Sequence, residues 1–274
     1  METSDFYGTE KVSRILLKIA PPVMLAQLIQ ALYNIVDSFF VGKYSETGLT
    51  ALSIIYPVQL LMIALGVGTG VGINTDMAYY FGIGKKKKAE GVAGTGTPLG
   101  LILWIIFAAV CYVTLPAYAG MSTDSPEVIQ DVVAYGRIVC LFSIGLFTEG
   151  IWSKILQAQG DMRTPMIAQI AGAVVNIILD PLLIFGMLGM PEMGISGAAV
   201  ATVSGQIVAA LIVMKKAWYR PPERSCYPGH IKRIYQLGIP NIIMQSAYTL
   251  YILGLNLILA GFSDQAVTAL GLYY

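Results

Sequence analysis

Seven long apolar runs are the feature that most constrains how this chain can fold. A helix crosses the hydrocarbon core of a bilayer with about 20 predominantly apolar residues. Inside a bilayer the backbone must satisfy its own hydrogen bonds, so runs of this length predict helices. The sequence therefore predicts an all-α polytopic membrane protein whose surroundings are the lipid bilayer. The runs cover approximately residues 18–41, 52–80, 91–118, 128–157, 165–188, 195–216 and 234–262.

The composition excludes most classes of soluble protein. Of the 274 residues, 56% are hydrophobic and only 12% are charged, whereas charged residues make up roughly 25% of an ordinary soluble domain. The net charge of +1 provides no basic excess for binding nucleic acid. The three cysteines, Cys111, Cys140 and Cys226, form neither a CxxC metal motif nor a disulfide framework. We therefore expect a protein that is not an enzyme, carries no resident cofactor and has no nucleic-acid partner.

The basic residues cluster on one side of the predicted spans. All but two of the 17 lysines and arginines lie in the N-terminal segment or in alternate connections between spans. Only Lys43 and Arg137 lie towards the other side. Cytoplasmic loops of membrane proteins carry this kind of excess of lysine and arginine. The pattern predicts a multi-pass protein of the plasma membrane with a cytoplasmic N-terminus.

The chain also contains an internal repeat with an offset of 218 residues. The second copy begins six predicted helices after the first, an even number, so both copies enter the membrane with the same polarity, as in transporters built from parallel repeats. We expect a six-helix lobe over residues 1–225, followed over residues 226–274 by the first helix and the start of the second helix of another lobe. The chain is then expected to be a fragment of a protein roughly twice 218 residues long. The identities include Pro22 with Pro240, Gln27 with Gln245, Thr50 with Thr268 and Tyr56 with Tyr274.

Two acidic residues are predicted to lie inside the membrane at matching depth. Asp37 lies 19 residues after Lys18, and Asp180 lies 17 residues after Arg163. At 1.5 Å per residue, both carboxylates would be roughly 25–29 Å from the cytoplasmic boundary. A charged side chain at the centre of a bilayer costs about 2.5–3.5 kcal/mol. Two acids at one depth therefore favour a functional site over a purely structural hydrogen bond between helices.

Each of these acids ends a polar stripe along one face of its helix. Two such faces at one depth predict a shared hydrophilic cavity, whose carboxylates carry protons or provide oxygen ligands for a small cation. Pro181 adds to this prediction, because it leaves the carbonyl of Ile177 without its helical partner. The first stripe is Gln27, Gln30, Asn34 and Asp37, and the second is Gln169, Gly172, Asn176 and Asp180.

Four other polar residues have weaker signals. Glu149 is a third intramembrane acid, but Lys154 could neutralise it, so a structural role and a substrate contact both remain open. Thr202 is a candidate ligand because its depth resembles that of the two acids. Asp76 lies near a helix end and is expected to be solvated. Asp161 lies in a turn and is expected to cap the helix that follows.

Three segments give the sequence a specific resemblance to multidrug and toxic compound extrusion (MATE) transporters. The stretch LYNIVDSFFVG, residues 32–42, looks like the first helix of that family. The segments QAQGDMRTPM and NIILDPLLIFG resemble its fourth-to-fifth helix region, and GISGAAVATVSGQ resembles its sixth helix. The resemblance implies twelve helices in two lobes, and export of organic cations or other drugs against an inward flow of Na⁺ or H⁺. It also implies that transport requires the second lobe.

The resemblance also implies which residues form the site. It maps the family's cation site onto Asp37, Asn176, Asp180 and Thr202. It adds Tyr135 as a residue that lines the cavity. The other candidates for the lining are Gln30, Asn34, Glu149 and Gln169.

Other classes fit the pattern less well. A relative that flips lipid-linked precursors would share this architecture, but its pyrophosphate substrate favours a more cationic cavity. Two intramembrane aspartates are also the minimum for an intramembrane aspartyl protease, although the Tyr-Asp and Gly-x-Gly-Asp contexts of that class are absent. A channel is a further alternative, although a repeat with one charged lobe favours two rocking halves over a ring-symmetric filter.

Overall fold

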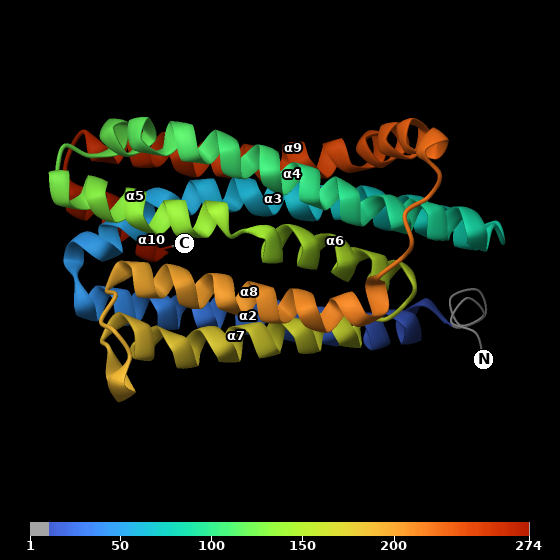
Figure 1. The fold of residues 1–274 in the computed structure, drawn as a ribbon, viewed down its shortest axis with the longest axis horizontal. Helices are drawn as coiled ribbons and strands as arrows, with labels where there is room; N and C mark the ends of the chain where they lie inside the picture. Colours follow the sequence, from blue (N-terminus) through green and yellow to red (C-terminus); the bar gives the residue numbers. More distant parts are fainter. Residues whose placement is uncertain (1–10, 274) are drawn as a thin grey trace.

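The computed structural model describes residues 11–273, and its helices run roughly along one long axis (Figure 1). This part of the chain contains no β-strand, which confirms the predicted all-α class. The α-helices are α2 (Val12–Tyr44), α3 (Glu46–Gly82), α4 (Lys86–Ser122), α5 (Pro126–Leu141), α6 (Ile144–Ala158), α7 (Arg163–Ile184), α8 (Ile195–Ala217), α9 (Tyr227–Ala260) and α10 (Asp264–Tyr273). Two short 3₁₀ turns, η1 (Met187–Gly189) and η2 (Arg224–Cys226), precede α8 and α9.

The seven predicted spans agree with the helices of the structure. Among the described residues, six helices are long and apolar enough to cross a bilayer, and α5 and α6, bent by 46° at their junction, are together long and apolar enough for a seventh span. This span, predicted as one run over residues 128–157, is broken before Ser143. A break leaves backbone carbonyls without helical partners, and two side chains satisfy them here. Ser143 donates to the carbonyl of Cys140 (2.7 Å), and the Trp104 indole donates to the carbonyl of Leu141 (3.0 Å).

The helices form two groups that the bent span connects. In one group, α2 and α8 both pack against α7. In the other, α4 and α9 both pack against α3 (Figure 1). The two halves of the bent span, α5 and α6, each contact both α3 and α8. Residues that face the interior from α2, α5, α7 and α8 are therefore brought to one place.

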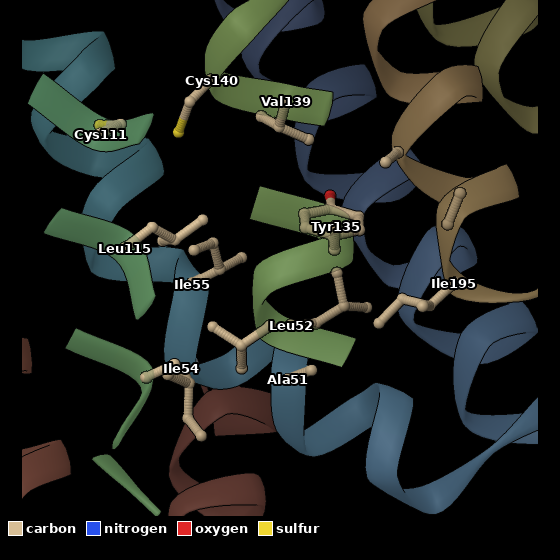
Figure 2. Close-up of a cluster of buried hydrophobic side chains, with 14 of the residues drawn as sticks. Ala51, Leu52, Ile54, Ile55, Cys111, Leu115, Tyr135, Val139, Cys140 and Ile195 are labelled. Carbon is tan, nitrogen blue, oxygen red and sulfur yellow. The ribbon is translucent and has the colours of Figure 1, made fainter. Parts of the chain in front are cut away.

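A buried hydrophobic cluster forms where α3, α4 and α5 meet (Figure 2). Ile54 and Ile55 of α3 and Leu115 of α4 belong to it together with Val139 of α5. Tyr135 of α5 belongs to the same cluster, and its side chain is almost completely buried. Packing of the ring against aliphatic neighbours fixes the place of the tyrosine hydroxyl, which belongs to the polar site described below.

The beginning of the second repeat packs against α3. Helix α9 lies along α3, and the hydroxyl groups of Thr50 on α3 and Thr268 on α10 are hydrogen-bonded at 2.6 Å. These two threonines are equivalent positions under the offset of 218 residues. Equivalent residues of two copies touch each other only close to a two-fold axis. A contact between Thr50 and Thr268 is therefore expected where two similar repeats pack against each other. Tyr274, the match of Tyr56, lies outside the described residues, and the division of the lobes at residue 225 stays a prediction.

Asp161 holds the turn between α6 and α7. One carboxylate oxygen accepts a hydrogen bond from the backbone N–H of Thr164 (3.0 Å). The other oxygen accepts from the Thr164 hydroxyl (2.6 Å) and from the Lys216 ammonium of α8 (3.2 Å). Partial burial raises the pKa of Asp161, but these hydrogen bonds and the charge of Lys216 together lower it below the ordinary value. The ionised carboxylate therefore stabilises the fold.

Replacement of Asp161 with alanine is expected to lower the free energy of unfolding by about 1 kcal/mol at neutral pH, because the start of α7 loses its capping carboxylate. The electrostatic part of this effect is present above about pH 4, the ordinary pKa of aspartate, and is lost as the pH falls through the lower folded pKa. Thermal unfolding of the parent and the variant in detergent, at pH 7 and at the lowest pH that the chain tolerates, measures the loss of stability and its dependence on pH. An equal difference between the parent and Asp161→Ala at the two pH values would contradict the assignment.

Candidate cation site

Two buried carboxylates meet between α2 and α7. Asp37 lies two turns before the end of α2, and Asp180 lies one turn before the end of α7. Asp180 is fully buried and Asp37 is 8% exposed. Because α2 packs against α7, the two carboxyl groups interact directly with each other.

Two further side chains complete this group from α7 and α8. The amide of Asn176, one turn before Asp180, donates to Asp180 Oδ1 and to the hydroxyl oxygen of Thr202, at 3.4 Å in each case. Asn176 and Thr202 are both buried. Both hydrogen bonds are long for an amide donor, so the oxygen atoms are only weakly satisfied. We refer to Asp37, Asn176, Asp180 and Thr202 as the carboxylate site.

Three oxygen atoms of the carboxylate site have no hydrogen-bond partner among the described residues: Asp37 Oδ1, Asp180 Oδ2 and Asn176 Oδ1. Buried polar atoms are normally paired, and two carboxylates in a medium of low dielectric repel each other. A proton on one carboxylate, or a cation between the two, relieves the repulsion and occupies an unpaired oxygen. Carboxylate, amide and hydroxyl oxygens are ligands for hard cations. The donor set therefore fits either a proton or a small hard cation.

Tyr135 of α5 extends the carboxylate site toward α3. Its hydroxyl accepts a hydrogen bond from the Gln59 amide of α3 (3.2 Å), and it interacts with Asp37 and Thr202. Gln59 is a polar residue that the sequence analysis missed. The signal was present, because Gln59 is the only amide in the apolar stretch over residues 52–65.

The other candidates for the cavity lining lie on α2 and in a second polar group between α6 and α7. On α2, Gln30 is half-buried and Asn34 is exposed. Glu149 of α6 accepts a hydrogen bond from the Ser153 hydroxyl (2.6 Å) and interacts with Gln169 of α7. This second polar group lies roughly three turns along α7 from the carboxylate site. The structure therefore brings Glu149 and Gln169 together, but at another level of the bundle.

Asp76 is a buried residue that the sequence analysis placed in solvent. The expectation that it is solvated is wrong: its side chain is fully buried and forms an ion pair with Arg233 of α9. The reason is that α9 packs over the last turns of α3, and this packing cannot be predicted from the sequence of α3 alone. The pairing depends on a contact between the two copies of the repeat.

Close approach of α7 and α8 positions Asn176 against Thr202. A Cβ atom on Gly172 of α7 would lie 2.7 Å from the Gly205 carbonyl, and one on Gly205 of α8 would lie 2.6 Å from the Gly172 carbonyl. Both distances are shorter than a carbon atom tolerates, so only glycine permits this spacing. Asn176, one turn after Gly172, reaches the neighbouring helix because the backbones are so close.

We expect Gly205→Ala to lower the free energy of unfolding by roughly 1–3 kcal/mol, because the new methyl group forces α7 and α8 apart. Gly120→Ala is the matched control, since a Cβ atom there meets nothing within 4 Å. Alanine also favours a helix over glycine by up to about 1 kcal/mol, so the control should be neutral or more stable. Thermal unfolding of both variants in detergent gives the comparison. A Gly205→Ala chain as stable as Gly120→Ala would show that α7 and α8 are not in close contact.

The fold and the site together define a class of protein. A bundle of long apolar helices, in which two buried carboxylates each have one oxygen without a partner among the described residues, fits a membrane transporter. The sequence model of the MatE family matches residues 22–182, which is more than half of the chain. The chain belongs to the MatE family, whose members are transporters and not enzymes.

Two curated relatives illustrate the similarity. The probable multidrug resistance protein NorM of Thermotoga maritima is 27% identical over 247 residues, which cover 85% of this chain and 52% of that protein. The multidrug export protein MepA of Staphylococcus saprophyticus is 25% identical over 289 residues, which cover 100% of this chain and 62% of that protein. The chain thus spans between half and two thirds of the length of these relatives.

A solved structure shows the same fold. The inward-facing conformation of a multidrug resistance MATE family transporter of the MOP superfamily is 25% identical, with a TM-score of 0.79. The match covers 93% of this chain and 59% of that chain. The similarity confirms that the chain folds as a helical membrane transporter.

Proposed function

We propose that this chain is the first lobe of a cation-coupled multidrug efflux antiporter of the plasma membrane. Such a protein exports organic cations or other drugs by alternating access while Na⁺ or H⁺ flows inward. The observation that carries the proposal is the carboxylate site, where buried Asp37 and Asp180 have oxygen atoms without partners among the described residues. Membership of the MatE family supports transport, and the names of the two relatives support drug substrates.

Transport is proposed for this lobe together with a second one. The two relatives are longer than this chain, and the repeat predicts a second lobe of similar design. Alternating access in transporters of this kind moves one lobe against the other around a site near their boundary. The substrate cavity then lies between the lobes, and the coupling ion binds at the carboxylate site within the first lobe.

In this proposal Asp37 and Asp180 share the coupling ion. Without an ion, the two carboxylates repel each other and weaken the contact between α2 and α7. A Na⁺ ion bound between them, or a proton on one of them, relieves this repulsion. Asn176 and Thr202 provide further oxygen ligands, and Tyr135 is a positioning residue held by Gln59. An ion shifts the equilibrium between two conformations only if its affinity for them differs. In this proposal the difference in affinity arises at the contact between α2 and α7.

The proposed orientation makes a prediction about Cys226. This thiol is exposed in the short turn before α9, on the side that the positive-inside rule assigns to the cytoplasm. It should react with a membrane-impermeant maleimide in inside-out vesicles and stay unlabelled in intact cells. Cys111 and Cys140 are buried and should stay unlabelled in both. Labelling of Cys226 in intact cells would reverse the orientation.

The ion site makes a prediction about stability in salt. A ligand that binds only the folded chain stabilises it, by about 2.7 kcal/mol at a concentration 100 times its Kd. The unfolding temperature of the chain in detergent should therefore rise with Na⁺ relative to K⁺ at equal ionic strength. Both Asp37→Asn and Asp180→Asn should abolish the rise. The Na⁺ response of the double variant should be no smaller than that of either single variant, because the two residues act as a unit.

The control for this experiment is Asp131→Asn. Asp131 accepts a hydrogen bond from Thr47 near the start of α5 and is not part of the carboxylate site, so this variant should keep the full Na⁺ response. If the coupling ion is H⁺, Na⁺ has no effect, and the same two variants abolish a pH-dependent part of the stability instead. An undiminished Na⁺ or pH response in Asp37→Asn or Asp180→Asn contradicts the proposed site.

A further inference from the structure

An ion pair with one buried partner joins the two copies of the repeat at the end of the bundle that carries the lysine run, residues 85–88. The Arg233 side chain is 40% exposed. Asp76 of α3 is fully buried and pairs with Arg233 of α9. The Arg233 guanidinium also lies over the rings of Tyr79 (4.6 Å to the ring centre) and Tyr80 (5.1 Å). One cation of α9 is therefore held by three side chains of α3.

Next to this ion pair, α3 and α9 approach so closely that their backbones touch. A Cβ atom on Gly72 would clash with the Ile234 carbonyl, and one on Gly238 would lie 2.6 Å from the Gly68 carbonyl. Thr69 lies on the same side of α3, is fully buried and interacts with α9. We call this contact between α3 and α9 the seam.

The opposite end of the seam is held differently. There the Asn256 amide of α9 donates to the Ser53 carbonyl of α3 (3.2 Å), and Thr50 is hydrogen-bonded to Thr268 of α10. These contacts are between neutral groups. Among the residues that the structure describes, the ion pair of α3 with α9 lies only at the end with the lysine run.

The ion pair has the properties of a contact with two states. The Asp76 carboxylate is shielded from water, and the attraction of the pair falls as water reaches it and the dielectric constant rises. Its loss leaves Asp76 buried without a partner, which is strongly unfavourable, so partial opening is disfavoured. The planar guanidinium of Arg233 adds stacking on two rings, which a lysine would not reproduce.

We propose that Asp76 and Arg233, together with Tyr79 and Tyr80, form a latch that holds the seam closed and opens when the two copies part at this end. Under the proposed orientation this is the cytoplasmic end, so the latch controls access from the cytoplasm during the transport cycle. That role rests on the proposed function, whereas closure of the seam by the ion pair does not.

A buried reporter cysteine in the seam tests the latch on the purified chain in detergent. Thr69→Cys is a small change at a fully buried position, made in a Cys226→Ser background so that the exposed native thiol is absent. The rate of reaction with a water-soluble maleimide then measures how often the seam opens. Cys111 and Cys140 remain, and because both are buried outside the seam, they report global loosening of the fold.

The decisive variant is Asp76→Asn with Arg233→Gln, which removes the latch without leaving a charge unpaired. We expect the Thr69→Cys thiol to react roughly tenfold faster or more, because the seam has lost its only ion pair among the described residues. Cys111 and Cys140 should not change. Arg233→Lys keeps the charge but loses the stacking, and should give an intermediate rate.

The matched control removes an ion pair outside the seam, in which Lys216 pairs with Asp161. Asp161→Asn lies within the first lobe and should leave the rate at Thr69→Cys within about twofold of the parent, since separate sites act independently. An unchanged rate in the double variant overturns the latch. Parallel acceleration of Cys111 and Cys140 overturns it too, because that result indicates global loosening. Neither readout involves ions or drugs, so failure of the latch is distinct from failure of the proposed function.

Discussion

The cost of an unpaired charge in an apolar medium organises this structure. Asp37 and Asp180 face each other between α2 and α7, and Asp76 faces Arg233 between α3 and α9. All three carboxylates are buried between helices instead of facing lipid. Because each takes its partner from another helix, the constraint that makes acids expensive in a bilayer also determines which helices are neighbours.

Glycine makes these neighbours close enough for short side chains to meet. Gly172 lies four residues before Asn176, and Gly72 lies four residues before Asp76, so in both cases one turn separates a backbone contact from a buried polar residue. Aspartate and asparagine are short, and they reach an adjacent helix only where the backbones approach. The glycine contacts therefore set the distances between the paired helices, and those distances allow the short side chains of the carboxylate site and of the proposed latch to reach their partners.

The sequence was sufficient for the fold class and for the level of Asp37 and Asp180, because hydrophobic length and the distance from basic residues are properties of one helix at a time. The break before Ser143 was not predictable in this way. No proline lies at the break, and the Trp104 indole that satisfies a freed carbonyl comes from another helix. The burial of Asp76 was missed for the same reason, since its partner belongs to the second copy of the repeat.

The two copies of the repeat match at one contact and differ at two charged positions. Thr50 and Thr268 are the same residue in equivalent positions, and they bond to each other. In contrast, Leu255 occupies the position equivalent to Asp37, and Ile15 occupies the position equivalent to Arg233. The carboxylate site therefore has no counterpart at this position of the second copy, so an ion bound there, as proposed, would contact the first copy alone. A latch built from α9 is asymmetric in the same sense, because α2 presents an isoleucine where α9 presents the arginine. The proposed site and the proposed latch thus differ in where their charges come from, because both carboxylates of the site precede the second copy, whereas the latch requires Arg233 of that copy.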